Sequence, residues 1–430
     1  MLRRILLLLL GGCLVSCTSE AKPNSNGPSP PGELVASSKP RDATPGITPE
    51  ELAQLTADNA AFGWDFYREI VEDGKNLFFS PHSISVALAM TWAGARNTTE
   101  AQMAEALHFT LGQGRLHPAF NALDLELGAR GDQSSPEAAL PFRLHVTNAL
   151  FGQVGFTFLD PFLDTLAQSY GAGVRLMDFP NEPEQSRVAI NDWVSDQTKE
   201  RIEDLIAPGI ITDLTRLVLV NAIYFSASWA KPFDEANTKD DPFTLLDGKE
   251  ISTPTMHAGV TTGYADGANY QAVELAYDGG QLSMLLIVPG RGELAAVESM
   301  LSADDVARIR SELREHLVDL ALPKFSFRSL VPAKAPLQAL GMVEAFSSKD
   351  ADLSGMNGQG NLYIQDVVHQ GFVAVDEKGT EAAAATAVIV GTTSIPPQAT
   401  LHVDRPFVFA IIDRPTGATL FLGRVVDPSK

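Results

Sequence analysis

Cysteine is nearly absent from this chain: among 430 residues only Cys13 and Cys17 are cysteines, and both lie in the first 17 positions. The rest of the sequence can therefore hold no disulfide, thiolate nucleophile or zinc-thiolate site, and packing must supply its stability. The enzyme motifs GxSxG, HExxH, GxxxxGKS/T and GxGxxG are missing too. The eight histidines are scattered singly, so a hydrolase of unassigned chemistry has only generic serine and histidine content behind it. The sequence singles out no catalytic residue and no metal ligand.

Basic residues are also scarce relative to acidic ones. The chain has 53 aspartates and glutamates against 32 lysines and arginines, a formal net charge of -21. That excess repels phosphate groups, which argues against nucleic acid and anionic lipid as partners. Hydrophobic residues make up 45% of the chain and charged residues 20%, values typical of a globular protein with a large core.

The N-terminal apolar run, residues 5–15, is too short to span a bilayer and follows Arg3 and Arg4, as in an export signal. It ends in Leu14-Val15-Ser16-Cys17, which resembles the lipobox of bacterial lipoproteins. Cleavage there would leave Cys17 first and open to acylation, which anchors a protein to a membrane. The alternatives are cleavage before Cys13, which leaves a short signal core, and ordinary secretion with Cys17 incidental. We predict a signal peptide over residues 1–17 and an exported protein, lipid-anchored at the cell envelope or outer membrane, or otherwise extracellular.

Residues 18–47 are rich in serine, proline and glycine, which predicts a flexible tether. The folded part begins at Thr48, a capping threonine followed by Pro49 and, three residues on, by Glu51. Segments with helical or strand-like periodicity then follow without a strict βαβ order, which predicts a single α+β domain over residues 48–430. The expected helices include residues 83–93 and 303–317, and the expected strands include residues 217–225, 282–288, 371–375 and 407–412.

The most informative segment is residues 376–397. Its first half is rich in alanine, which alone would favour a helix. The β-branched run at residues 388–390 and the extended Ile395-Pro396-Pro397 conflict with a helix, and such a local conflict often marks function. Read with a period of two, one face is uncharged and small or β-branched, so the segment can enter a sheet interior as a strand. That face consists of Thr380, Ala382, Ala384, Thr386, Val388 and Val390.

Several motifs along the chain resemble those of the serpin family of serine protease inhibitors. The run Glu377-Lys378-Gly379-Thr380-Glu381-Ala382-Ala383 resembles the serpin hinge that precedes the reactive loop. Other segments resemble serpin motifs in the family's order: residues 76–81 (NLFFSP), 219–225 (LVNAIYF), 322–325 (LPKF), 406–409 (PFVF) and 422–425 (LGRV). The hinge residues implied by the resemblance are Glu377, Gly379, Thr380, Glu381, Ala382, Ala383, Ala384 and Ala385.

The resemblance implies a metastable serpin fold of three β-sheets and about eight or nine helices with an exposed reactive loop. It implies a monomer without a cofactor that is an irreversible inhibitor and not an enzyme. In that mechanism the protease cleaves the loop, is held as an acyl-enzyme, and is carried away as the loop inserts into the main sheet. The alternative is a non-inhibitory serpin acting as a binding or carrier module, but the small residues Ala382 to Ala385 favour insertion.

Counting from Glu377, the family's spacing places the reactive bond between Thr393 and Ser394. Thr393 would then enter the primary pocket of the protease, and with the apolar residues upstream it suits a shallow apolar pocket. The favoured partner is therefore an elastase-like serine protease, bound covalently. Cleavage at Val390-Gly391 or within the Val-Ile-Val run is the alternative.

Five further residues resemble serpin residues that control opening of the main sheet. Ser80, Ser83, Asn221 and His369 are expected beneath the sheet, where their hydrogen bonds would gate the separation of its strands. The alternative is a satisfied polar cluster that only stabilises the core. Trp229 is expected at the end of the sheet where the hinge first inserts, or else is a plain core aromatic.

Overall fold

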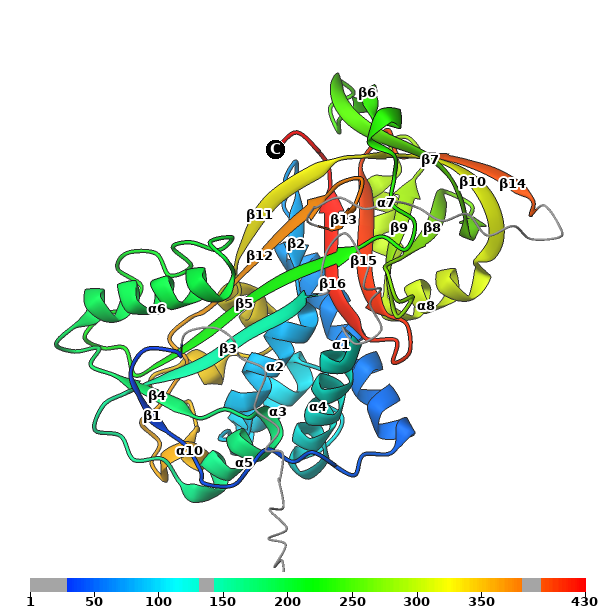
Figure 1. Cartoon of the computed structure of the whole chain (residues 1–430). Coiled ribbons are helices and arrows are strands. Elements are labelled where there is room, and N and C mark those ends of the chain that lie inside the picture. The colour runs from blue at the N-terminus through cyan, green and yellow to red at the C-terminus, as the bar shows by residue number, and fades with distance from the viewer. Residues whose placement is uncertain (1–28, 131–142, 381–395) are drawn as a thin grey trace, which may run out of the picture.

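Two hydrogen-bonded β-sheets and a set of helices make up the computed structural model, which describes residues 29–130, 143–380 and 396–430 (Figure 1). The main sheet has seven strands in the order β1-β4-β3-β5-β13-β12-β11. Their bounds are β1 Glu33–Val35, β4 Val174–Met177, β3 Arg143–Gln153, β5 Leu217–Ser228, β13 Gly379–Thr380, β12 Val367–Val375 and β11 Phe325–Pro332. We call the end of this sheet at Ser228 its upper end and the end at Leu217 its lower end.

The second sheet has nine strands, in the order β14-β10-β7-β8-β9-β15-β16-β2 with β6 paired to β7. The strand β7 is long enough to pair with β6 and β10 along much of its length and with β8 at its end. Hydrogen bonds through β7 therefore join two of the three expected sheets into one. The bounds are β2 Leu77–Phe79, β6 Lys239–Thr244, β7 Glu250–Asp266, β8 Tyr270–Ala276, β9 Leu282–Pro289, β10 Arg314–Pro323, β14 Gln398–His402, β15 Phe407–Asp413 and β16 Thr419–Val425.

The helix predicted to begin at Thr48 is confirmed, together with its capping box. The Glu51 amide donates to the Thr48 hydroxyl, and the Thr48 amide donates to the Glu51 carboxylate at 2.9 Å. Among the described residues, no helix combines the length and apolar character needed to cross a membrane. The α-helices are α1 Pro49–Ile70, α2 Pro81–Trp92, α3 Asn97–Ala106, α4 Gln113–Gly128, α5 Asp160–Tyr170, α6 Pro183–Gln197, α7 Leu294–Met300, α8 Ala303–Glu312, α9 Lys334–Ala339 and α10 Ser354–Asn357, and short 3-10 helices η2 Glu235–Asn237 and η3 Glu344–Phe346 are also present.

The α+β class is confirmed, but one predicted helix was too long. The helix expected over residues 303–317 ends at Glu312, and residues 314–317 begin β10 instead. They pair with β7, where Leu317 lies opposite Thr261, and the Leu317 amide donates to the Pro397 carbonyl. Pairing with β7 on one side, and with β14 on the other from Leu317 onward, outweighs the local helical periodicity of this segment. The strands expected at residues 217–225, 282–288, 371–375 and 407–412 lie within β5, β9, β12 and β15.

The main sheet is covered on both faces. One face belongs to the large core that includes α1, α2 and the second sheet, and alternate residues of β5, such as Leu219, Ile223 and Phe225, point into it. The other face packs under α6, where Val220 and Ala222 of β5 lie with Trp193 of α6 in a second apolar cluster (Figure 1). A strand entering the sheet beside Val220 and Ala222 must therefore present two faces that both tolerate burial.

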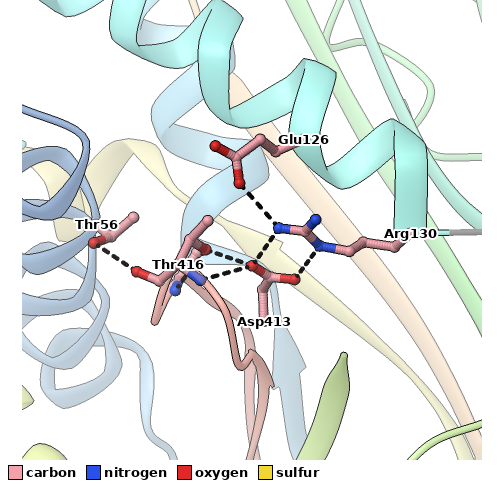
Figure 2. A network of polar contacts seen from close by, with 6 residues as sticks. Thr56, Glu126, Arg130, Asp413 and Thr416 are labelled. Atoms are coloured by element: carbon pink, nitrogen blue, oxygen red, sulfur yellow. Dashed lines mark hydrogen bonds and ion pairs between the residues drawn. The ribbon is translucent and has the colours of Figure 1, made fainter. Parts of the chain in front are cut away.

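A buried ion pair joins α4 to the hairpin between β15 and β16 (Figure 2). Arg130, just after α4, donates to both carboxylate oxygens of the fully buried Asp413 at 2.7 and 3.1 Å. The hydroxyl and amide of Thr416 donate to the same carboxylate, and the Thr416 carbonyl accepts from Thr56 of α1. The network therefore links α1 and α4 to the β15–β16 hairpin.

The described part of the expected tether, residues 29–47, lies against the domain. Residues 33–35 form β1, which pairs with the outer edge of β4, so this part is not a free linker. Lys39 forms an ion pair with Asp164 of α5 at 2.8 Å, and Arg41 forms one with Asp124 of α4 at 2.6 Å. We call residues 33–42 the N-terminal strap. Its composition is that of a linker, and the partners that fix it lie far away in the sequence.

Candidate functional site

The centre of the main sheet contains a seam between β5 and β12. These strands are parallel neighbours, paired from Leu219 opposite Val367 to Tyr224 opposite Phe372. At the upper end the two-residue strand β13 lies between them: Thr380 pairs with Ala227 of β5 and with Val375 of β12, antiparallel to both. Gly379 and Thr380, the first residues of the hinge in the sheet, therefore lie between β5 and β12 at the upper end, and below them β5 and β12 pair directly with each other.

Glu377 anchors the start of the hinge by a buried ion pair. Its side chain is almost fully buried and accepts from Lys324 at 2.7 and 3.0 Å and from the Thr238 hydroxyl at 2.7 Å. Burial alone would raise the pKa of Glu377, but the hydrogen bonds from Lys324 and Thr238 outweigh it, so the pKa is lowered. Next to it, desolvation raises the pKa of the half-buried Asp376. The carboxylate of Glu377 is thus ionised and held in place.

Trp229 lies where the hinge enters the sheet. Its indole nitrogen donates to the Asp376 carbonyl at 2.9 Å, and its amide donates to the Lys378 carbonyl at 2.8 Å. The indole stacks on the buried ring of Tyr277 at 4.7 Å, and the Tyr277 hydroxyl is hydrogen-bonded to the Thr380 hydroxyl at 2.8 Å. Gly379 fits tightly here, because a Cβ would come within 2.1 Å of the Ala227 carbonyl oxygen. These contacts fix the register of the hinge.

Ser80, Ser83, Asn221 and His369 form one buried network in the middle of the seam. Asn221 and His369 are register partners across the seam, and the His369 Nδ1 is bonded to the Asn221 carboxamide oxygen. The Asn221 amide donates to the Ser83 carbonyl at 2.7 Å and to Asn148 of β3 at 2.5 Å. Ser80 caps α2, and its amide lies 3.1 Å from the His369 Nε2. The network links both sides of the seam to the helix beneath it.

His369 is neutral in this network. The Ser80 amide donates to Nε2, so Nε2 is an acceptor and Nδ1 carries the proton donated to Asn221. Complete burial lowers the pKa of His369 from 6.5 to about 3. A proton on Nε2 would remove the Ser80 contact, so the closed seam favours the neutral imidazole.

The structure brings the sequence-predicted residues together at two places on one seam. Glu377, Gly379 and Thr380 lie at its top with Trp229, and Ser80, Ser83, Asn221 and His369 lie lower down. Sequence reasoning missed the hinge partners Lys324 and Tyr277. Lys324 falls within the recognised LPKF motif, which is the signal that could have found it. The remaining predicted site residues, Glu381, Ala382, Ala383, Ala384, Ala385, Thr393, Ser394 and Cys17, lie outside the described residues.

Within the described parts of the chain, no group of three histidine, aspartate or glutamate side chains is placed to hold a metal ion. At the upper end of the seam, β13 is paired antiparallel to both β5 and β12, and below it those two strands pair directly with each other.

Comparison with known proteins gives the family. A family model described as Serpin (serine protease inhibitor) matches residues 57–428, so the chain belongs to the serpin family. It is 38% identical to the leukocyte elastase inhibitor of Bos taurus over 88% of this chain and all of that protein. It is 36% identical to an uncharacterized serpin-like protein of Thermococcus kodakarensis over 99% of this chain and 97% of that one.

The solved structures agree with this assignment. The crystal structure of tengpin, a thermophilic serpin, in the native state superposes with a TM-score of 0.80 at 28% identity, covering 90% of this chain and 97% of that one. A tumour-suppressing serpin superposes with a TM-score of 0.77 at 24% identity, which supports the fold. The predicted serpin fold is confirmed, and the protein belongs to a family of inhibitors rather than of enzymes.

Proposed function

We propose that this protein is an irreversible, suicide-type inhibitor of serine proteases, with an elastase-like protease as the favoured target. The protease attacks the reactive loop and forms an acyl-enzyme. The freed loop then extends β13 down the seam and carries the enzyme with it. The observation that carries the proposal is β13 itself, which is hydrogen-bonded between β5 and β12 above a seam where those strands pair directly.

The register of β13 predicts how the loop would fill the seam. Because Thr380 lies opposite Ala227, residues 382, 384, 388 and 390 would lie opposite Phe225, Ile223, Leu219 and Leu217, all part of the main core. Thr386 would meet Asn221, the polar residue of the seam. Thr380 is buried, so on insertion the later members of its face would enter the core beside it. This is the face that the sequence keeps uncharged.

The energetics favour insertion. Ten residues, 381–390, would each gain ladder hydrogen bonds worth on the order of 1 kcal/mol net, and the Val and Ala side chains would be buried as well. The sum is comparable to the stability of a whole domain, about 5 to 15 kcal/mol. Such a gain is large enough to drive the movement of an attached protease.

The target class rests on the reactive loop and on relatives. The proposed reactive bond, Thr393–Ser394, would present a small β-branched residue to the primary pocket of the protease, which suits an elastase-like enzyme. Several relatives at 34–38% identity are named leukocyte elastase inhibitors. Cleavage at Val390-Gly391 would present an equally apolar residue.

A gel assay tests the proposal directly. The purified chain is mixed with an elastase and run under denaturing conditions, and a covalent band of summed mass is expected. Ala384→Glu would place a charge opposite Ile223 in the core and should convert the inhibitor into a substrate. Ala383→Glu is the matched control, because on insertion residue 383 would lie on the opposite face, beyond the part covered by the second apolar cluster, as would the natural Glu381. Cleavage of the unchanged protein without a covalent band would refute the proposal.

A specific observation also favours the second candidate, a non-inhibitory carrier. A groove of about 520 Å³ lies between α1 and α8, and Trp64, Arg68 and Arg310 are among its lining residues. A groove of this size can hold a small molecule. A carrier would be cleaved by elastase without forming the covalent band, so the same gel separates the two functions.

We also propose that the mature chain begins at an acylated Cys17 and is moored outside the cell at the envelope. The lipobox-like residues 14–17 support this proposal. The expected intact mass of the membrane-extracted protein is that of residues 17–430 plus the lipid. Cys17→Ser should release the protein into the soluble fraction, and an unmodified N-terminus would contradict the anchor.

A further inference from the structure

The N-terminal strap joins the main sheet at the end opposite the hinge. Its strand β1 pairs with residues 174–176 of β4, and β4 pairs with β3 through Val174 opposite Leu150. Leu150 of β3 in turn lies opposite Leu219 of β5, close to the lower end. The hinge lies at Ala227 and Ser228 of the same strand. Eight or nine residues of β5 separate the two levels, which is roughly 28 Å along the strand.

The chain enters the strap at this lower end. Gly32 lies against the end of β4, where its Cβ position would fall within 2.8 Å of the Met177 sulfur, and the Arg175 side chain donates to its carbonyl. From there the strap runs past α5 and α4. Ser37 and Lys39 both donate to Asp164, and Arg41 donates to Asn121 at 2.8 Å and to Asp124. Three strand residues and two ion pairs thus fix the point at which the N-terminal segment leaves the domain.

Only a short segment separates this fixed point from the proposed lipid. Residues 18–28 number eleven, so they span at most about 40 Å when fully extended and about 20 Å as a flexible coil. Without the strap, the free segment would extend to the start of α1 at Pro49, and the domain could then tumble freely. The strap fixes where residues 18–28 leave the domain, and these residues are few. Together the two features constrain which end of the domain faces the bilayer.

We propose that the lower end of the main sheet is the membrane-facing pole of the anchored inhibitor, and that the strap presents the reactive loop away from the bilayer. This inference rests on the proposed acylation of Cys17. The surface near the pole is suited to a bilayer neighbour, because Leu34 of β1, Val154 after β3 and Leu159 before α5 are exposed apolar side chains. The net charge of -21 gives no attraction to anionic headgroups, so the orientation is set mechanically by the strap.

The consequence is a directional inhibitor. The hinge lies roughly 28 Å along β5 from the level of the strap, so with the lower end at the bilayer the loop faces proteases that arrive from the aqueous phase. A protease embedded in the same membrane would have to reach around the domain. The partner of the lower pole is thus the lipid surface, and that of the upper pole is a soluble protease.

Fluorescence energy transfer to a dye in the bilayer tests the orientation. Because the folded part contains no cysteine, Val154→Cys and Ala236→Cys each provide one labelling site, the first at the lower pole and the second in η2 beside the hinge. The lipidated full-length chain is labelled and reconstituted into neutral vesicles that carry an acceptor lipid. Transfer from Val154→Cys should exceed transfer from Ala236→Cys severalfold.

A strap-release variant provides the control. Lys39→Glu with Arg41→Glu places like charges beside Asp164 and Asp124 and should bring the two transfer efficiencies close together. Lys249→Glu with Lys349→Glu makes the same change in net charge away from the strap and should leave the difference intact. Formation of the elastase complex by each variant in detergent shows that the domain is folded.

The outcomes separate the inference from the functions on which it rests. Equal transfer from both positions, or a difference that survives strap release, would overturn the orientation while the vesicle-bound chain still inhibits elastase. Failure to float with vesicles, or dye attached to an unmodified Cys17 in the parent chain, would overturn the anchor and the orientation with it. Loss of the elastase complex in the parent chain would instead refute inhibition.

Discussion

At the scale of single residues, Glu377 carries the ion pair that holds the top of the hinge. Glu377→Gln keeps the shape but removes the charge opposite Lys324, whose side chain is 37% exposed. Because water can still solvate part of the Lys324 ammonium group, we expect the variant to lose about 1–2 kcal/mol of native-state stability. Urea unfolding of the uncleaved protein measures this loss. Glu235→Gln is the control, because the Glu235 side chain, which pairs with Lys378, is 66% exposed. An equal loss of stability there would show that burial of Glu377 does not strengthen its ion pair.

His369 gives the seam a pH dependence with a definite sign. Its pKa is about 3 in the folded protein against 6.5 unfolded, so its contribution is fully present above pH 6.5 and is lost as the pH falls towards 3. The buried His82 and His117, with pKa values lowered to about 4, act in the same direction.

His369→Gln separates the contribution of the seam from those of the other histidines. A glutamine amide can keep contacts to Ser80 and Asn221 but cannot titrate, so we expect this variant to lose less stability than the parent between pH 7 and pH 4. Thermal unfolding across that range is the measurement. Identical pH profiles for the two proteins would show that the seam does not titrate.

At the scale of elements, the contact between α4 and the β15–β16 hairpin depends on one buried charge pair. Asp413→Asn removes the buried charged partner of Arg130, which is only 10% exposed, and leaves it paired with the half-exposed Glu126, so we expect a cost of about 3 kcal/mol in unfolding free energy. Glu126→Gln removes the other, half-exposed partner of Arg130 and should cost less than about 1 kcal/mol. Urea unfolding measures both costs. Similar losses of stability in the two variants would show that the buried partner of Arg130 contributes no more than the half-exposed one.

Local signals predicted the elements well, and distant pairing explains what they missed. The capping box at Thr48 and the apolar run of β5 depend on residues close in sequence, so both could be read directly. Residues 314–317 look helical, yet β7 and Pro397 pair with them from far away in the chain. The strap was missed for the same reason, since its partners Asp124 and Asp164 are more than 80 residues away.

The candidate site shows the same division. The uncharged alternating face of the reactive loop is visible in the sequence, because period two is a property of any strand. The contact of Glu377 with Lys324 and Thr238 could not be predicted, because the two partners come from other segments that only the fold brings to the hinge; the LPKF motif pointed to Lys324 but not to its partner. Family motifs located the seam residues, and the structure then supplied their hydrogen bonds and the neutral state of His369.

At the scale of the whole molecule, the proposal requires that the native chain is not its most stable form. Cutting the reactive loop with a small amount of elastase-like protease should let residues 381–390 complete the strand that β13 begins. At about 1 kcal/mol per added residue, the midpoint of thermal unfolding should rise by roughly 10 °C or more. Cleaved Ala384→Glu is the control, because its charge would have to enter the core opposite Ile223, and it should show little rise. If the cut parent chain melts where the intact chain does, the seam stores no energy and cannot trap a protease.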